Sequence, residues 1–393
     1  MNSRSGHPSA HPQVLVVLGT RPEAIKLAPV LGALQRRGVS TSVCVTGQHR
    51  EMLDPVLSFF DIRPDHQLSV MRHGQTLAQL TATILVSVSE ILQKTKPALM
   101  LVHGDTTTTL AASLAAYYHS VPLGHVEAGL RTGLKNSPFP EEMNRKIAGA
   151  LTDLHFAPTE RAKQNLIAEG HPAERIWITG NTAIDALLHT HNIVSAQSSR
   201  YARELHRCGG PNGNGRRKVL ITAHRRESFG VGFEQICNAI LQLSQHNPSV
   251  DFIYPVHMNP NVRGPVESIL APAAGKDLNN LFLIEPLDYP TFVYLMGISE
   301  FILTDSGGIQ EEAPSLGKRV LVMRAATERP EGVSAGTSVL VGADQQRIVA
   351  GVNALLEGSS PAFLGSNPYG DGRAAERIAD RVQAHLSSRE AAR

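Results

Sequence analysis

Short apolar runs alternate with longer helical stretches along most of the chain. In the N-terminal half the runs are Val14–Leu18, Thr41–Val45, Ala98–Val102 and Val121–His125. Runs of this kind are typical of strands buried on both faces, as in a sheet covered by helices. Pro22 suits the first turn of the helix after the first run, because that position needs no backbone N–H. Since a helical stretch follows each run, we expect a mainly parallel sheet.

The same alternation restarts after Gly209–Gly215, a glycine-rich segment that predicts a flexible surface loop. The runs Val219–Thr222, Phe252–Val256, Leu281–Glu285 and Phe301–Thr304 then predict a second parallel sheet. A chain of 393 residues suits two domains of nearly equal size, so we expect an α/β fold with two Rossmann-like domains. The expected parts are a disordered tail over residues 1–13, a first domain over 14–185, a second domain over 186–370, and a C-terminal helix over 371–388 that rejoins the first domain.

Composition narrows the class of protein. Hydrophobic residues make up 42% and charged residues 18%, as in a folded chain, and the net charge of +2 gives no global attraction for nucleic acid or an anionic membrane. Three cysteines, Cys44, Cys208 and Cys237, are too few for a disulfide framework, and no Cys/His cluster has zinc spacing. No apolar run is long enough to span a bilayer, and the first residues lack the apolar core of a secretory signal. We expect a soluble cytoplasmic protein without a metal or cofactor.

Polar clusters follow the predicted strands, where ligands bind in open parallel sheets. After Phe301–Thr304, the residues Ser306, Gly307 and Gly308 permit close backbone approach at a helix start, which predicts an anion site suited to a diphosphate. A plain strand-to-helix turn is the alternative. Glu312, about one turn further on, could take ribose hydroxyls or be an ordinary solvated residue.

Basic residues follow the first predicted strand of each half. Arg21 and Lys26, about one helical turn apart, could face a phosphate together, although each alone suits a surface position. His224, Arg225 and Arg226 could donate hydrogen bonds to a departing diphosphate. A solvated charge run is the alternative for this second group, and Arg329-Pro330-Glu331 is a similar, weaker case.

Three carboxylates complete the candidate chemistry. Asp105 and Glu127 close successive predicted strands, so both should lie at one edge of the first sheet, and Glu141 follows a proline-rich loop that leads into a helix. Carboxylates that converge from different strand ends are what general acid and base catalysis needs. The alternatives are helix capping for Asp105 and loop hydrogen bonds for the two glutamates.

A series of short segments extends these clusters along nearly the whole chain. In order they read GTRPEAIKLAPV (19–30), TGQHREMLD (46–54), HGDTTTT (103–109), GHVEAGLRTG (124–133), PFPEEMNR (138–145), GNTAIDA (180–186), HRRESFG (224–230), YPVHMNP (254–260), DSGGIQEEAPSLGK (305–318), TERPEG (327–332) and SNPYGDG (366–372). With these segments the chain closely resembles the non-hydrolysing UDP-N-acetylglucosamine 2-epimerases. Four positions depart from the usual family pattern, and none is a proposed acid: Ala223, Phe139, Arg319 and Ala325.

The resemblance implies a glycosyltransferase-B-like pair of domains that face an interdomain cleft, and the interconversion of UDP-N-acetylglucosamine and UDP-N-acetylmannosamine. In the family, UDP is eliminated to leave a 2-acetamidoglucal and is added back after the proton returns on the other face. The resemblance also implies a homodimer and, in bacterial members, a second UDP-N-acetylglucosamine as an activator. The roles that it implies are catalysis for Asp105, Glu127, Glu141 and His224, substrate binding for Arg21, Lys26, Arg225, Ser306, Gly307, Gly308 and Glu312, and activator binding for Gln48, Glu51 and Glu227.

The sequence leaves other functions open as alternatives. A glycosyltransferase with a UDP-sugar donor would share the two-domain architecture but would need an acceptor pocket, which no segment identifies. A hydrolysing epimerase would release free N-acetylmannosamine. A catalytically silent nucleotide-sugar sensor would not need Asp105, Glu127, Glu141 and His224. Analysis of the products formed from UDP-N-acetylglucosamine separates these possibilities.

Overall fold

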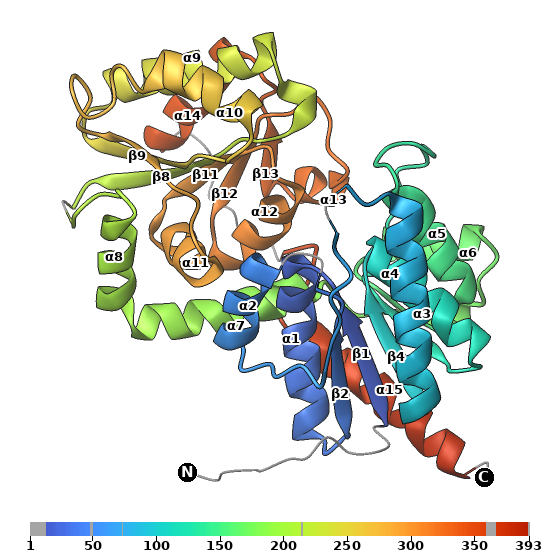
Figure 1. Ribbon diagram of the computed structural model, residues 1–393. Helices are drawn as coiled ribbons and strands as arrows, with labels where there is room; N and C mark the ends of the chain where they lie inside the picture. The colour runs from blue at the N-terminus through green and yellow to red at the C-terminus, as the bar shows by residue number, and fades with distance from the viewer. Residues whose placement is uncertain (1–12, 48–49, 73, 214, 359–366, 392–393) are drawn as a thin grey trace. The chain divides into compact units, whose positions relative to one another are not determined.

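The structure is a computed structural model that describes residues 13–47, 50–72, 74–213, 215–358 and 367–391 (Figure 1). The expected tail over residues 1–13 lies outside these ranges except for its last residue. The chain divides into two compact units, which are described separately. Unit 1 comprises residues 1–186 and 369–393, and unit 2 comprises residues 187–368.

Unit 1 is built on a seven-stranded sheet in the order β3-β2-β1-β4-β5-β6-β7. Each of its strand pairs in the described chain is parallel, as the sequence predicts. The strands are β1 Val14–Leu18, β2 Thr41–Val45, β3 His66–Gln67, β4 Leu99–His103, β5 Leu123–Val126, β6 Leu154–Ala157 and β7 Ile176–Ile178. The helices are α1 Arg21–Arg36, α2 Arg50–Phe59, α3 Leu77–Thr95, α4 Thr107–Tyr118, α5 Glu141–Leu151, α6 Glu160–Ala168 and α15 Ala374–Ala391, with the short η1 Ala173–Arg175 and the start of α7 Thr182–Ala196.

Unit 2 repeats this arrangement on a six-stranded sheet in the order β10-β9-β8-β11-β12-β13, again with parallel pairing throughout its described strands. The strands are β8 Arg217–Thr222, β9 Val250–Pro255, β10 Leu281–Ile284, β11 Phe301–Thr304, β12 Arg319–Val322 and β13 Ser338–Leu340. Its helices, besides the rest of α7, are α8 Ser198–Arg207, α9 Val231–His246, α10 Pro260–Pro265, α11 Tyr289–Ile298, α12 Gly307–Glu312, α13 Pro330–Ser334 and α14 Gln345–Leu356, with short turns at η2 Arg226–Ser228, η3 Val266–Leu270 and η4 Ala313–Leu316.

Both sheets are doubly wound, which places their ligand sites. Helices cover both faces of each sheet in Figure 1, and the five residues of β1 are completely buried, as a central strand requires. In both units the strand order reverses beside the first strand, between β1 and β4 in unit 1 and between β8 and β11 in unit 2. Ligands of such sheets bind outside the carboxyl ends of the strands at that reversal.

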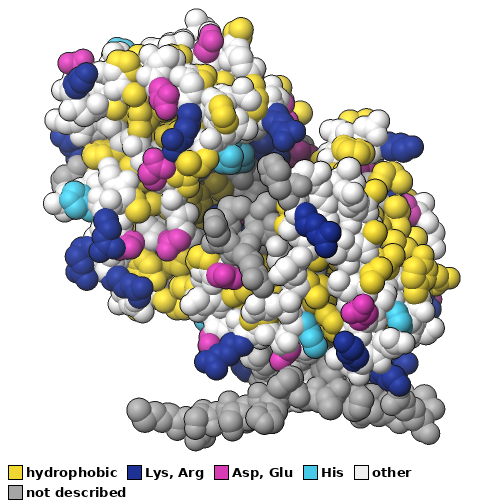
Figure 2. All heavy atoms as spheres, viewed as in Figure 1, with side chains coloured by type: hydrophobic (Ala, Val, Ile, Leu, Met, Phe, Trp, Pro, Cys, Tyr) yellow, Lys and Arg dark blue, Asp and Glu magenta, His cyan; other side chains and the backbone are white. Residues whose placement is uncertain are grey.

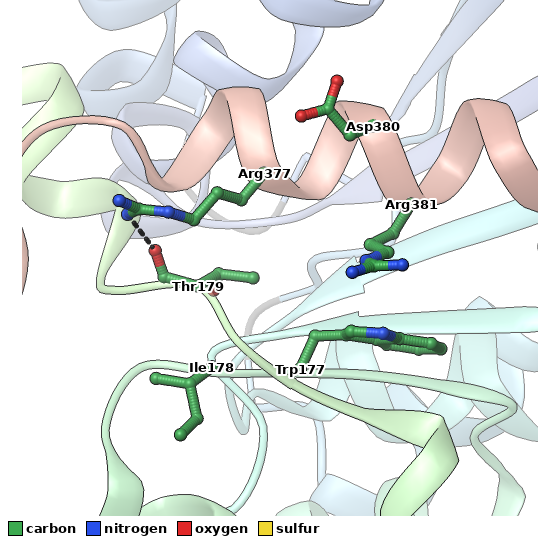
Figure 3. Close-up of a pocket in the computed structure, with 6 residues that line it drawn as sticks. All are labelled: Trp177, Ile178, Thr179, Arg377, Asp380 and Arg381. Carbon is green, nitrogen blue, oxygen red and sulfur yellow. Dashed lines mark hydrogen bonds between the residues drawn. The ribbon is translucent and has the colours of Figure 1, made fainter.

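The C-terminal helix α15 belongs to unit 1. Asp185 accepts hydrogen bonds from the backbone N–H groups of Ala374 and Ala375 at 3.2 and 2.8 Å, which satisfies the first turn of α15. Further along, Arg377 donates to the Thr179 carbonyl at 2.9 Å, and the Arg381 guanidinium lies 5.6 Å from the centre of the Trp177 ring (Figure 3). These contacts fix α15 beside β7, the edge strand of the sheet.

Candidate active site

The acidic residues of unit 1 occupy the carboxyl end of its sheet. β4 and β5 pair so that His103 lies opposite Val126, and Asp105 and Glu127 follow these adjacent strand ends. Glu127 has a left-handed backbone, with φ of 63°, which is uncommon for a residue with a side chain. The prediction that Asp105 and Glu127 share one edge of the sheet is therefore confirmed.

Glu127 is held by groups from three other parts of unit 1. Lys26 of α1 forms an ion pair with Glu127 Oε1, and Asn181 Nδ2 donates to the same oxygen at 3.0 Å. The second oxygen, Oε2, lies 3.7 Å from His103 Nε2. The side chain of Glu127 is only 10% exposed, so its environment is largely protein rather than water. A carboxylate fixed in this way is suited to a defined proton transfer.

Asp105 is joined to helix α5. Arg145 forms an ion pair with Asp105 Oδ2, and Asn144 Nδ2 donates to the Asp105 carbonyl at 2.9 Å. Glu141 is the first residue of the same helix, and its Oε2 is buried with no hydrogen-bond partner in the described part of the chain. The alternative role of Asp105 as a helix cap is wrong, because Thr106 caps α4 by accepting from the Thr109 N–H at 3.1 Å.

The loop between β1 and α1 is joined to the start of α4 through the side chain of Glu23. Glu23 is buried and accepts from the N–H groups of Gly19 and Thr20 at 3.0 and 2.7 Å, and from the Thr106 hydroxyl at 2.8 Å. Burial raises the pKa of Glu23 above its ordinary value. A Cβ atom at Gly19 would lie 2.2 Å from the Thr108 hydroxyl oxygen, so this position requires glycine. Arg21, predicted to bind phosphate, is exposed at the start of the helix that carries Lys26.

Three neutral histidines lie beneath this edge of the sheet. His103, His125 and His155 come from β4, β5 and β6, and His125 lies directly opposite His155 in the strand register. Burial lowers the pKa of His103 to about 3, of His125 to about 4 and of His155 to about 3. His125 Nε2 lies 2.7 Å from the Gly104 carbonyl, which fixes the turn between His103 and Asp105.

In unit 2, His224 and Arg225 follow β8 and lie against Asp305, which follows β11. The completely buried Asp305 accepts from the backbone N–H groups of His224 and Arg225 at 2.7 and 2.8 Å through Oδ2. Its other oxygen lies 3.4 Å from His224 Nδ1. The carboxyl ends of β8 and β11 are also tied by a 2.6 Å contact between the Thr222 and Thr304 hydroxyls. His224 and Arg225 therefore lie at the carboxyl end of β8, as the sequence predicts, and their role in binding and catalysis stays a prediction.

Ser306, Gly307 and Gly308 lie at the start of α12, and Glu312 is its last residue. The Ser306 N–H donates to the Thr304 hydroxyl at 2.9 Å, which turns the chain from β11 into the helix. A Cβ at Gly307 would lie 3.1 Å from Arg329 Cζ, so the small residue allows this guanidinium close to the backbone. Arg329, a weaker candidate from the sequence, therefore lies beside the predicted anion site, where its guanidinium is paired with Glu311 at 2.7 Å.

The residues expected to bind an activator are only partly described. Gln48 lies outside the described residues, and Glu51 lies in α2 with its side chain undescribed. Glu227 forms an ion pair with Arg324, which also pairs with Glu328 at 2.7 Å. The hydrogen bonds from Arg324 are the main cause that lowers the pKa of Glu328 to about 2.

The profile of the UDP-N-acetylglucosamine 2-epimerase family matches residues 32–383. A Ralstonia solanacearum protein named probable UDP-N-acetylglucosamine 2-epimerase is 55% identical over 379 residues, covering 95% of this chain and all of that protein. The UDP-N-acetylglucosamine 2-epimerase of Escherichia coli strain K12 is 52% identical over 375 residues, covering 94% and 98% of the two chains. The chain belongs to the UDP-N-acetylglucosamine 2-epimerase family. The sequence resemblance is thereby confirmed.

A solved structure supports the same family at the level of the fold. The crystal structure of UDP-GlcNAc 2-epimerase from Neisseria meningitidis bound to UDP-GlcNAc matches with a TM-score of 0.85 and 46% identity, covering 94% of this chain and 99% of that one. The expected class, two α/β units of glycosyltransferase-B-like type with parallel sheets, is thus confirmed for this epimerase family member.

Sequence reasoning missed the residues that hold the predicted ones in this member of the epimerase family. Asn181, Arg145 and Asp305 contact Glu127, Asp105 and His224 through positions far away in the sequence. All three lie inside the matching segments GNTAIDA, PFPEEMNR and DSGGIQEEAPSLGK, so those segments carried a signal for them.

Other features of the epimerase chain lie apart from these residues. A pocket of unit 1 beside β7 and α15 is lined by Trp177, Ile178, Thr179, Arg377, Asp380 and Arg381, none of them a predicted site residue (Figure 3). Within the residues that the structure describes, no group of three or more His, Cys, Asp or Glu side chains is placed to hold a metal ion. Over the same ranges, no helix combines the length and apolar character needed to cross a bilayer.

Proposed function

We propose that this protein interconverts UDP-N-acetylglucosamine and UDP-N-acetylmannosamine without net hydrolysis. The observation that carries the proposal is the pair Asp105 and Glu127 on adjacent strand ends, each fixed by a cation, in a member of this epimerase family. A glycosyltransferase needs an acceptor site rather than two fixed proton-transfer groups. The epimerase from Neisseria meningitidis was solved with UDP-GlcNAc bound, which supports the same substrate class here.

The proposed reaction separates the inversion into two half-reactions. The hydrogen on sugar carbon 2 is not acidic in the intact substrate, because no carbonyl adjoins that carbon. Cleavage of the bond between carbon 1 and the UDP oxygen develops positive charge at carbon 1, and a carboxylate then takes the carbon 2 proton as the double bond forms. A second acid returns a proton to the opposite face, and the UDP oxygen adds back to carbon 1. Asp105, Glu127 and Glu141 are the proposed proton-transfer groups.

The leaving diphosphate is the other centre of charge. We propose that His224, Arg225, Arg21 and Lys26 stabilise it, with the backbone at Ser306–Gly308 and the adjacent Arg329. The contribution of Lys26 would pass partly through Glu127, since the two form an ion pair. Glu312 is the proposed ribose contact. Gln48, Glu51 and Glu227 stay proposed contacts of a second, activating UDP-N-acetylglucosamine.

The test of the activity is the fate of the carbon 2 hydrogen. Incubation with UDP-N-acetylglucosamine in D2O should give UDP-N-acetylmannosamine with deuterium at carbon 2, detected by chromatography and mass spectrometry. Asp105→Asn, Glu127→Gln and Glu141→Gln should each lower turnover by about 100- to 10,000-fold with the fold intact. Glu160→Gln, at an exposed carboxylate of the same unit, is the matched control and should turn over normally. Free N-acetylmannosamine as the product, or an epimer that keeps its original hydrogen, contradicts the proposal.

We further propose that the protein is a homodimer that acts in the cytoplasm. Unit 1 exposes large apolar side chains on α3, α4 and α5, namely Val86 at 58%, Tyr117 and Tyr118 at 64% each and Ile147 at 39%, and Figure 2 shows hydrophobic atoms gathered over this region. Apolar patches of this kind mark association surfaces. The three cysteines are free thiols, which suits a reducing compartment.

The dimer proposal is tested by sedimentation velocity. Val86→Lys combined with Tyr118→Lys should convert the dimer to a monomer, because two buried charges at an interface are strongly unfavourable. Val231→Lys is the control, since Val231 is 74% exposed but lies on unit 2. A wild-type protein that sediments as a monomer at all concentrations refutes the dimer without touching the catalytic proposal.

A further inference from the structure

Asp305 and His224 form a pair in which the carboxylate is completely buried and the imidazole is partly exposed. Asp305 is completely buried, and its Oδ2 is saturated by the two backbone N–H groups of His224 and Arg225. Its Oδ1 is buried with no hydrogen-bond partner among the described residues and lies 3.4 Å from His224 Nδ1. A buried carboxylate oxygen is costly to leave unpaired, so the Nδ1 position of His224 should carry a proton directed at it.

That requirement determines the state of the other ring nitrogen. A neutral imidazole has one N–H, and if it is on Nδ1 then Nε2 is a lone pair that only accepts hydrogen bonds. The groups that face the His224 ring are Asp305 after β11, Arg225 in its own loop, and His257 after β9, whose ring stacks on His224 at 5.2 Å. Burial is the largest influence on His224 and lowers its pKa, with Arg225 and His257 acting in the same direction and Asp305 opposing them.

A diphosphate presents only acceptor oxygens at neutral pH, so a lone pair on Nε2 would repel it. A ring that gained a second proton would donate from both nitrogens, from Nδ1 to Asp305 and from Nε2 to the phosphate. The His224 side chain is 35% exposed, whereas the Asp305 side chain is completely buried. A proton can therefore reach the ring from solvent without displacing the carboxylate.

We propose that Asp305 is a positioning residue that keeps a proton on His224 Nδ1, so that binding of UDP draws a second proton from solvent onto Nε2. The inference rests on the proposed function, in which His224 faces the leaving diphosphate. It adds to that function a coupling between anion binding and protonation. The proton taken up with UDP is released again when the diphosphate leaves the site, so the balance over one turnover is zero.

The experiment is calorimetric titration of the full-length protein with UDP in two buffers of different ionisation enthalpy at about pH 8. Wild-type protein should take up between about 0.5 and 1 proton per UDP bound, and its Kd should rise by up to about tenfold per pH unit. In Asp305→Asn the amide N–H faces Nδ1, which moves the single ring proton to Nε2. This variant should therefore bind UDP with little proton uptake and a nearly flat pH dependence. His224→Asn should also show little uptake.

The control is Glu234→Gln on α9, a carboxylate of unit 2 outside the site, which should keep the wild-type uptake. Should Asp305→Asn fail to fold, nitrogen NMR of wild-type His224 replaces it: Nδ1–H alone is expected without UDP and both N–H groups with UDP. The same uptake in Asp305→Asn as in wild type, or a His224 that keeps one protonation state on binding, overturns the inference. UDP that binds without uptake leaves the proposed function standing, whereas wild-type protein that does not bind UDP refutes both.

Discussion

Three buried histidines should make unit 1 sensitive to mild acid. His103, His125 and His155 are at most 3% exposed, and burial lowers each pKa from 6.5 to about 3 or 4. The unfolded chain therefore binds protons on these residues before the folded chain does. Stability contributed by the neutral rings is fully present above pH 6.5 and is lost as the pH falls toward the folded pKa values.

The loss in the free energy of unfolding near pH 5 depends little on how far each folded pKa is lowered. At that pH a ring with a pKa of about 3 or 4 is still neutral in the folded state, while an unfolded histidine is almost fully protonated. Each residue then lowers the free energy of unfolding by about 2 kcal/mol relative to pH 7, and the three together by about 6 kcal/mol. That loss is comparable to the whole stability of many domains, about 5 to 15 kcal/mol.

Trp177 makes the measurement specific to unit 1. It is the single tryptophan of the chain and lies on β7, whose partner β6 carries His155 opposite Ile176. Urea unfolding followed by Trp177 fluorescence between pH 7 and 5 should show the free energy of unfolding falling steeply. In His155→Gln the average slope over this pH range should be smaller by about 1 kcal/mol per pH unit, whatever the variant loses in packing.

Phe156→Leu is the matched control for that slope. Phe156 is also completely buried on β6, so the change lowers stability, but it removes no titrating group and should leave the pH slope unchanged. A wild-type protein equally stable at pH 7 and 5, or a His155→Gln variant with the wild-type slope, would refute the argument.

Four further outcomes follow from other features of the chain. Burial raises the pKa of Asp185 to about 6, so the folded state binds this proton before the unfolded state does, and the free energy of unfolding rises as the pH falls through 6. Asp185→Asn removes this gain, so the free energy of unfolding should fall more steeply with acid, by about 1 kcal/mol per pH unit in the same urea titration. Lys26→Met should lower kcat by about 100-fold, because Glu127 loses its cation, whereas unchanged kcat would limit that ion pair to a structural role. UDP at about 100 times its Kd should stabilise the protein by about 2.7 kcal/mol in thermal or urea unfolding, and EDTA should leave activity unchanged; activity lost to EDTA and restored by a divalent ion contradicts the second expectation.

The central strands were predictable from the sequence because a strand buried on both faces appears as a continuous apolar run. β1, β2 and β11 begin and end where their apolar runs do. The strands that sequence reasoning missed are of other kinds. β3, β7 and β13 have only two or three residues, β6 carries the buried His155, and β12 begins at Arg319. Their apolar character is too short or too interrupted to stand out, and only pairing with a neighbour defines them.

The candidate site likewise contains residues that local sequence identifies and partners that it does not. The rule that ligands meet the carboxyl ends of strands identified Asp105, Glu127 and His224 from local sequence. The partners of the first two were not accessible in that way, because Lys26 is 101 positions from Glu127 and Arg145 is 40 positions from Asp105. Such contacts depend on the order of strands in the sheet, which a local pattern does not encode.

The two units also solve one structural problem with different residues. In each unit, the loop after the first strand lies where the strand order reverses, and its backbone N–H groups need a hydrogen-bond acceptor there. In unit 1 the buried carboxylate of Glu23, from the helix that follows, accepts from Gly19 and Thr20. In unit 2 the carboxylate comes instead from Asp305 on the neighbouring strand end. The other oxygen of Asp305 lies 3.4 Å from His224 Nδ1, so in the proposal above this carboxylate both supports the loop and positions a proton on a side chain. Both oxygens of Glu23, by contrast, accept from the loop and the start of α4.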